Sequence, residues 1–270
     1  MSDDKHQLLS KVPAVTLGFW IVKILATTLG ETGGDTVTMT WLGETTPHPV
    51  PYGYLIGTGI FGLALVALVV AQIRTHRFNA WLYWATIIAS TTCGTTLADF
   101  ADRSLGIGYP GGSLLLLTCV LVSLFVWYRA LGTVDVNTVA SPREESFYWI
   151  TITFSQTLGT ALGDWSADTA SDGGWGLGYS GAASVFGLAL ALLAALYFST
   201  KVSRIFLFWA AFILTRPLGA TVGDFLDKPI AKGGLELSRP LATLALAVAI
   251  IVLILVIPQR PGEHPRSDAG

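Results

Sequence analysis

The sequence is poor in charged residues and in cysteine. Asp, Glu, Lys and Arg together make up 13% of its 270 residues, whereas hydrophobic residues make up 52%; soluble domains carry about 25% charged residues. Two cysteines, Cys93 and Cys119, are too few for a disulfide framework. The patterns of a buried zinc protease, a nucleophile elbow, a phosphate loop and a dinucleotide site are absent. These absences argue against the corresponding enzymes, and the composition predicts an integral membrane protein.

One frame of residues occurs four times along the chain. Each copy has a Trp, a Gly ten residues later and an Asp five residues after that, with an aromatic residue directly before the Trp. The copies are Trp20/Gly30/Asp35, Trp84/Gly94/Asp99, Trp149/Gly159/Asp164 and Trp209/Gly219/Asp224. The Trp residues lie 64, 65 and 60 residues apart, so the chain is a fourfold internal repeat.

An apolar run follows every copy of the frame, at residues 54–71, 113–127, 182–198 and 241–257. With its flanking residues, each run approaches the ~20 residues that a helix needs to cross ~30 Å of hydrocarbon. Two helices per repeat are therefore predicted, in repeats at residues 12–73, 78–130, 143–200 and 203–258, with a disordered tail at 259–270. We expect one all-α membrane domain of eight transmembrane helices, arranged as four parallel two-helix repeats around a central axis.

Lysine and arginine predict the orientation. Ten of them lie in the termini and the even-numbered connections, and four lie in the odd-numbered connections. By the positive-inside rule, both termini and the connection at residues 130–145 are expected to be cytoplasmic. The first segment is expected to be a retained helix with Pro13 in its first turn.

Small residues accompany the frame. The framed Gly and the residue before the Asp form a small-xxx-small pair in every copy: Gly30/Gly34, Gly94/Ala98, Gly159/Gly163 and Gly219/Gly223. Such pairs let helix backbones approach closely in lipid, so we expect the four frame helices to meet near the axis and the second helices to face lipid. The framed Trp residues are interpreted as anchors in the membrane interface.

A carboxylate ends each frame helix, where it faces the negative end of the helix dipole. Further acids follow at Asp102, Asp168 and Asp227. Two interpretations are open. The acids cap turns or pair with Arg103 and Lys228, or they gather round the axis to bind a cation, as acids at the membrane edge commonly do.

The first frame helix carries a polar stripe at i+4 spacing, Lys23, Thr27, Glu31 and Asp35. The equivalent stripes are Ile87, Thr91, Thr95, Asp99, then Ile152, Gln156, Thr160, Asp164, then Phe212, Arg216, Ala220, Asp224. These charges form either an internal salt bridge, Lys23 with Glu31 or Arg216 with a carboxylate, or a transport path. In such a path Glu31 and Asp35 are cation ligands or proton carriers, and Lys23 and Arg216 are counter-charges.

The opening segment, KVPAVTLGFWIVKILATTLGETGGD, resembles a bacterial family described as uncharacterised membrane-anchored proteins. That family is built from four tandem copies of a two-helix repeat of unknown function with a characteristic Trp. The resemblance covers nearly the whole chain and implies the eight-helix layout and a place in a bacterial inner membrane. GETGGD also resembles the acidic-Gly-Asp motifs of manganese and calcium exporters, although the spacing differs.

The available donors are carboxylates, hydroxyls and one amide, which favour hard ions such as Mg²⁺, Ca²⁺ or Mn²⁺. We therefore predict a secondary transporter of small cations, with manganese as the first choice, and not an enzyme. No cofactor is expected because the cation is cargo. The expected partners are the lipid bilayer and the cation, without nucleic acid. The alternatives are a membrane enzyme with paired carboxylates and a structural or sensory protein in which the acids only hold the repeats together.

The residues assigned to this path fall into two sets. The expected metal ligands are Glu31, Asp35, Asp99, Asp164 and Asp224. The expected path and counter-charge residues are Lys23, Thr27, Thr95, Gln156, Asp168, Arg216, Asp102 and Asp227.

The predicted orientation is tested with epitope tags at both termini and within residues 130–145. All three tags are expected to become accessible only after the cell membrane is permeabilised, because positive-inside bias holds them in the cytoplasm. A tag that is accessible on intact cells would contradict the parallel-repeat topology.

Overall fold

The computed structural model describes residues 9–263, which form eight α-helices, short helical turns and one two-stranded sheet. The first helices of the repeats, here called the inner helices, are α2 (Leu17–Asp35), α4 (Ala80–Asp99), α6 (Pro142–Ala167) and α8 (Arg204–Asp227). The second helices, here called the outer helices, are α3 (Gly53–Arg74), α5 (Tyr109–Leu131), α7 (Gly178–Ser199) and α9 (Arg239–Val256). This arrangement confirms the all-α, four-repeat fold.

Each inner helix begins at a side-chain cap. Thr16, Asn79, Ser141 and Ser203 each accept a hydrogen bond from the backbone N–H three residues later. The helices end in two ways. α2 and α4 continue into π-helical turns at Thr36–Trp41 and Phe100–Ser104, whereas α6 and α8 pass into loops with 3₁₀ turns at Ala170–Asp172 and Ile230–Lys232. The first two repeats thus share one ending, and the last two share another.

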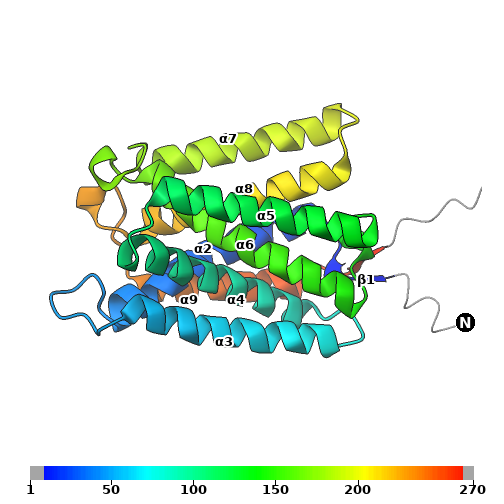
Figure 1. Cartoon of the computed structure of the whole chain (residues 1–270), viewed down its shortest axis with the longest axis horizontal. Helices are drawn as coiled ribbons and strands as arrows, with labels where there is room; N and C mark the ends of the chain where they lie inside the picture. The colour runs from blue at the N-terminus through cyan, green and yellow to red at the C-terminus, as the bar shows by residue number, and fades with distance from the viewer. Residues whose placement is uncertain (1–8, 264–270) are drawn as a thin grey trace, which may run out of the picture.

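The inner helices form a closed ring. α2 packs on α4, α4 on α6, α6 on α8, and α8 packs back on α2. Each outer helix packs mainly on the inner helix of the following repeat: α3 on α4, α5 on α6, α7 on α8, and α9 on α2. The helices run along the long axis of the molecule (Figure 1). The last repeat therefore closes the ring by covering the first.

Five of the helices are long and apolar enough to cross a membrane: α3, α5, α7, α8 and α9. The outer helices among them are mostly exposed, with 6% to 17% of their most apolar windows buried. The inner helices α2, α4 and α6 are not in this group, because their polar stripes lower their hydropathy. They lie in the same ring as α8, which is in the group, and their polar faces are enclosed by the bundle.

Glycine allows the inner helices to touch. A Cβ atom on each framed Gly would collide with a stripe residue of the next inner helix, in the pairs Gly30 with Thr91, Gly94 with Gln156, Gly159 with Arg216 and Gly219 with Thr27. The last pair joins the fourth repeat to the first. The second small residues behave alike, because Gly34 faces Thr95 at 3.0 Å and Gly223 faces Glu31 at 2.7 Å from the ideal Cβ position. The small-xxx-small pairs thus let the helix backbones approach, as the spacing predicts.

The two chain ends pair with one another. β1 (Leu9–Pro13) and β2 (Pro261–Glu263) form an antiparallel pair, because α9 returns to α2 and brings both ends together. Pro13 ends this strand, so its expected place in the first turn of a helix is wrong: the helix starts at Leu17, after the Thr16 cap. Residues 261–263 were expected in a disordered tail and form β2 instead, while residues 264–270 lie outside the described residues.

Three framed Trp residues are buried in the core and do not anchor the protein in the membrane interface. Trp84, Trp149 and Trp209 are at most 4% exposed. Trp84 Nε1 donates to Gln259 at 3.1 Å, and Trp209 Nε1 donates to the carbonyl of Val134 at 2.9 Å. The interface interpretation fails because the covering outer helices and the terminal segments enclose this end of the ring.

The glycine contacts predict the effect of adding a side chain. Gly159→Leu and Gly219→Leu are expected to lower the free energy of unfolding by about 1–3 kcal/mol, because the neighbouring inner helix must move away. Gly187→Leu, on α7 with nothing within 4 Å of its added Cβ, is the matched control. Thermal melting and yield of the purified variants measure the effect. Equal melting of all three would contradict the packing.

Candidate functional site

The four stripes all lie inside the ring of inner helices. Every one of their residues is at most 5% exposed, including the charged Lys23, Glu31 and Arg216. Aligned by repeat, they make four levels along the axis. The Asp level lies at the end of the bundle here called the aspartate end, and the strands β1 and β2 lie at the opposite end, here called the terminus end. The axis is therefore a buried column of polar and charged side chains.

Arg216 crosses the axis and contacts every other inner helix. Its Nη2 donates to Glu31 Oε2 on α2 at 2.9 Å, to Thr95 Oγ1 on α4 at 2.6 Å and to Thr160 Oγ1 on α6 at 2.5 Å. Its side chain is 0% exposed, and Glu31 is 2% exposed. Of the two salt bridges that the sequence left open, Arg216 with a carboxylate is therefore present. Lys23 does not reach Glu31; its Nζ has no hydrogen-bond partner within residues 9–263 and lies 4.1 Å from the centroid of the Phe212 ring.

Two basic residues bridge the aspartates of neighbouring repeats. Lys228 Nζ is 2.5 Å from Asp35 Oδ2 and 3.0 Å from Asp224 Oδ1, joining the first and fourth repeats. Arg103 Nε is 2.7 Å from Asp99 Oδ1, and its Nη2 is 3.9 Å from Asp164 Oδ2, joining the second and third. Arg239 Nε lies 3.7 Å from Asp227 Oδ2. The pairings with Arg103 and Lys228 are those that the ion-pair interpretation of the acids expects, and Arg239 adds a third basic side chain that it did not name.

The buried aspartates at the aspartate end outnumber the basic side chains that pair with them. The buried aspartates of this end are Asp35, Asp99, Asp164, Asp224 and Asp227. These five carboxylates pair with three basic side chains, so the carboxylates outnumber the basic groups by two. Several buried oxygens have no hydrogen-bond partner among the described residues: Asp35 Oδ1, Asp99 Oδ2, Asp224 Oδ1 and both oxygens of Asp227. Asp224 Oδ1 lies within ion-pair distance of Lys228 but without hydrogen-bond geometry.

Two groups of carboxylates could hold a cation. One oxygen from each of Glu31, Asp164 and Asp224 lies within 4.8 Å of the others, and the same is true of Asp35, Asp224 and Asp227. Asp224 belongs to both groups, so the two groups adjoin each other. Such a set of hard oxygen donors suits Mg²⁺, Ca²⁺ or Mn²⁺.

The other expected path residues lie in different surroundings. Thr27 Oγ1 donates to backbone carbonyls of Ile24 and Thr215, and the Gln156 amide has no hydrogen-bond partner among the described residues. Asp102 lies in the π-helical turn after α4, and Asp168 accepts a hydrogen bond from the Tyr109 hydroxyl at 2.5 Å. Neither joins a carboxylate group of the axis.

Aromatic rings fill the core at the terminus end of the axis. The residues before the framed Trp residues are Phe19, Tyr83, Tyr148 and Phe208, and each is at most 8% exposed. Ring centroids are 6.3 Å apart for Phe19 and Phe208 and 6.5 Å apart for Phe19 and Tyr83, and the hydroxyls of Tyr83 and Tyr148 are hydrogen-bonded. This aromatic layer and Arg216 both lie between the carboxylates and the terminus end.

Lys228, Arg103 and Arg239 were not among the residues assigned to the path. A signal for two of them is in the sequence, because Lys228 follows Asp224 by four residues and Arg103 follows Asp99 by four, a spacing that puts side chains on one helix face. Arg239 lies twelve residues after Asp227 and at the start of α9, so no local pattern relates the two.

The repeats match a known family. Four successive segments, residues 18–78, 82–133, 147–203 and 207–258, match the Repeat of Unknown Function DUF347. The chain belongs to this family. Comparisons with curated proteins and with solved structures gave no match. DUF347 membership agrees with the expected family of tandem two-helix repeats and supplies no activity, so the function of this DUF347 protein is argued from its axis.

The contacts of Arg216 predict a stability cycle. Arg216→Met is expected to lower the free energy of unfolding by about 3–5 kcal/mol, because it leaves the Glu31 carboxylate buried without its partner. The double variant Arg216→Met, Glu31→Met is expected to regain most of that loss. Arg129→Met, on an exposed position of α5, is the control. Melting of the purified variants measures the cycle, and a double variant less stable than Arg216→Met would contradict it.

Proposed function

We propose that the protein binds a small, hard cation at the aspartate end and carries it across the membrane as a secondary transporter. The supporting observation is the group formed by Asp35, Asp224 and Asp227. Their oxygens approach within 4.8 Å of one another, the side chains are buried, and each residue has an oxygen without a hydrogen-bond partner among the described residues.

The charge of this group favours a divalent ion. Taking a carboxylate out of water costs several kcal/mol unless an opposite charge compensates for it. The five buried aspartates outnumber the three basic side chains that pair with them by two, and one divalent cation would compensate for two carboxylates. Lys228 Nζ already lies among these carboxylates as a tethered cation. Metal entry would displace this ammonium from Asp35, and manganese is the proposed cargo among the hard ions.

Glu31 couples binding to the barrier in the axis. Its Oε2 is the only carboxylate oxygen within 4.0 Å of Arg216 among the described residues, and Glu31 also belongs to the carboxylate group with Asp164 and Asp224. A cation that bound Glu31 would compete with the guanidinium for this oxygen. Arg216 would then lose its counter-charge and move, which would open the axis below the carboxylates only when cargo is present.

The scaffold function is the second candidate. It is favoured by one observation, that Glu31 and each buried aspartate lie within 4.0 Å of a lysine or arginine nitrogen. In that case the acids only join the repeats. A membrane enzyme has less support, because its paired acids need contact with a substrate, and the stripe carboxylates are at most 5% exposed.

Transport separates the two candidates. Glu31→Gln and Asp35→Asn are each expected to reduce manganese uptake by proteoliposomes at least about tenfold while the fold persists, because an amide keeps the size but loses the charge that compensates for the cation's dehydration. Asp99→Asn, Asp164→Asn and Asp224→Asn complete the series. Asp172→Asn, in an exposed loop, is the control. Full uptake by the folded double variant Glu31→Gln, Asp35→Asn would leave only the scaffold function.

A further inference from the structure

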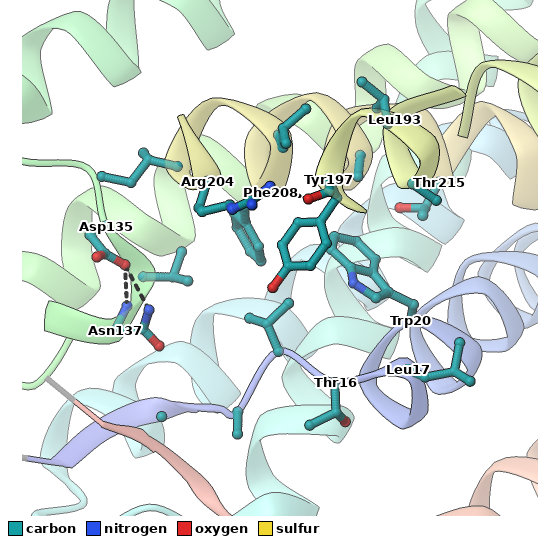
Figure 2. Close-up of a pocket in the computed structure, with 18 of the residues that line it drawn as sticks. Thr16, Leu17, Trp20, Asp135, Asn137, Leu193, Tyr197, Arg204, Phe208 and Thr215 are labelled. Atoms are coloured by element: carbon teal, nitrogen blue, oxygen red, sulfur yellow. Dashed lines mark hydrogen bonds between the residues drawn. The ribbon is translucent and has the colours of Figure 1, made fainter. Parts of the chain in front are cut away.

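A groove runs along the seam between α2 and α8 at the terminus end. It has a volume of about 800 Å³ and is lined by the first turns of α2 and α8, the last turns of α7, and the segments around residues 134–137 and 260–263. Figure 2 shows Arg204, Asp135 and Asn137 at one end, Leu193 and Thr215 at the other, and the Tyr197 ring between them. The groove lies outside the carboxylate groups and shares no residue with them.

The packing of the outer helices leaves this seam open. α7 packs on α8 and α9 packs on α2, but α8 and α9 barely touch. Large apolar side chains stand exposed beside the groove, with Leu17 75% and Phe198 85% exposed. In a bundle surrounded by lipid these side chains contact acyl chains. The groove therefore opens towards the hydrocarbon layer.

One end of the groove is charged and the rest is apolar. Arg204 and Arg260 line the charged end together with Asp135 and Glu263. The Arg204 guanidinium stacks 4.2 Å from the centroid of the Tyr197 ring and donates to the Tyr197 and Thr200 carbonyls, so its position is fixed. Within residues 9–263 neither arginine forms a salt bridge. Guanidinium groups bind phosphate well, and carboxylates bind an ammonium group.

The length of the groove matches one leaflet. It extends along α8 from Arg204 to Thr215, and eleven residues of helix at 1.5 Å each span about 16 Å. Half of a ~30 Å hydrocarbon layer is ~15 Å. A molecule with its charged group at Arg204 would thus reach the middle of the bilayer with its apolar part.

We propose that this groove binds one aminophospholipid of the leaflet at the terminus end. The phosphate contacts Arg204 and Arg260, the headgroup amine lies near Asp135 and Glu263, and one acyl chain follows Leu193 and Ala211 towards Thr215. The two charge signs at the mouth select a zwitterionic headgroup over an anionic one. This site is independent of the proposed cation transport.

The test uses the full-length protein purified in a mild detergent and incubated with vesicles of equal parts phosphatidylethanolamine and phosphatidylglycerol. Native mass spectrometry then counts the lipids that each chain retains. The wild-type protein is expected to retain one phosphatidylethanolamine. Ala194→Trp, which fills the groove, is expected to reduce this retention about tenfold, and Arg204→Gln with Arg260→Gln to a similar degree, because these variants lose the charge-assisted hydrogen bonds to the phosphate.

Ala195→Trp is the matched control, because Ala195 neighbours Ala194 on α7, is exposed and does not line the groove. It is expected to retain lipid like the wild type. Because Arg260 is exposed, Arg260→Gln alone is expected to fold, and it tests the site even if Ala194→Trp fails to fold. Undiminished retention by the charge variants, a preference for phosphatidylglycerol, or a dimer that buries Phe198 in place of lipid would overturn the proposal.

Discussion

The close approach of the four inner helices at their framed glycines is the constraint on which the rest of the structure depends. Because a Cβ on Gly30, Gly94, Gly159 or Gly219 would collide with the next helix, only glycine permits this ring. The ring is so narrow that one side chain, Arg216, reaches the other three inner helices. It also brings the four framed aspartates close enough for two basic residues to bridge them.

Fourfold sequence symmetry and asymmetric charge have separate roles along this axis. The glycines and aspartates repeat in every copy and build the ring. Lys23, Glu31 and Arg216 each occur in one repeat only, so they make the repeats differ from one another along the axis. Carboxylates are gathered at the aspartate end, and the two buried basic residues Lys23 and Arg216 lie between them and the aromatic layer. In the proposed transport, a cation would be attracted at one end and held back in the middle until the path opens.

The sequence predicts the repeats, the two helices in each and the burial of the stripes, because these follow from fixed spacings within one helix. It does not predict which outer helix covers which inner helix, because the periodicity within one helix carries no information about the helices that pack against it. α3, for example, packs on α4 of the following repeat. For the same reason it misses the pairing of β1 with β2 and the burial of Trp84, Trp149 and Trp209. The carboxylate group of Asp35, Asp224 and Asp227 joins the first repeat to the last, so only the closed ring reveals it.

The most direct test of the proposed cation site is a crystal structure with bound manganese, with anomalous diffraction recorded at the manganese edge. We predict an anomalous peak between the carboxylates of Asp35, Asp224 and Asp227, with the Lys228 ammonium displaced from Asp35. No peak at a saturating manganese concentration, with Lys228 still on Asp35 and Asp224, would contradict the account.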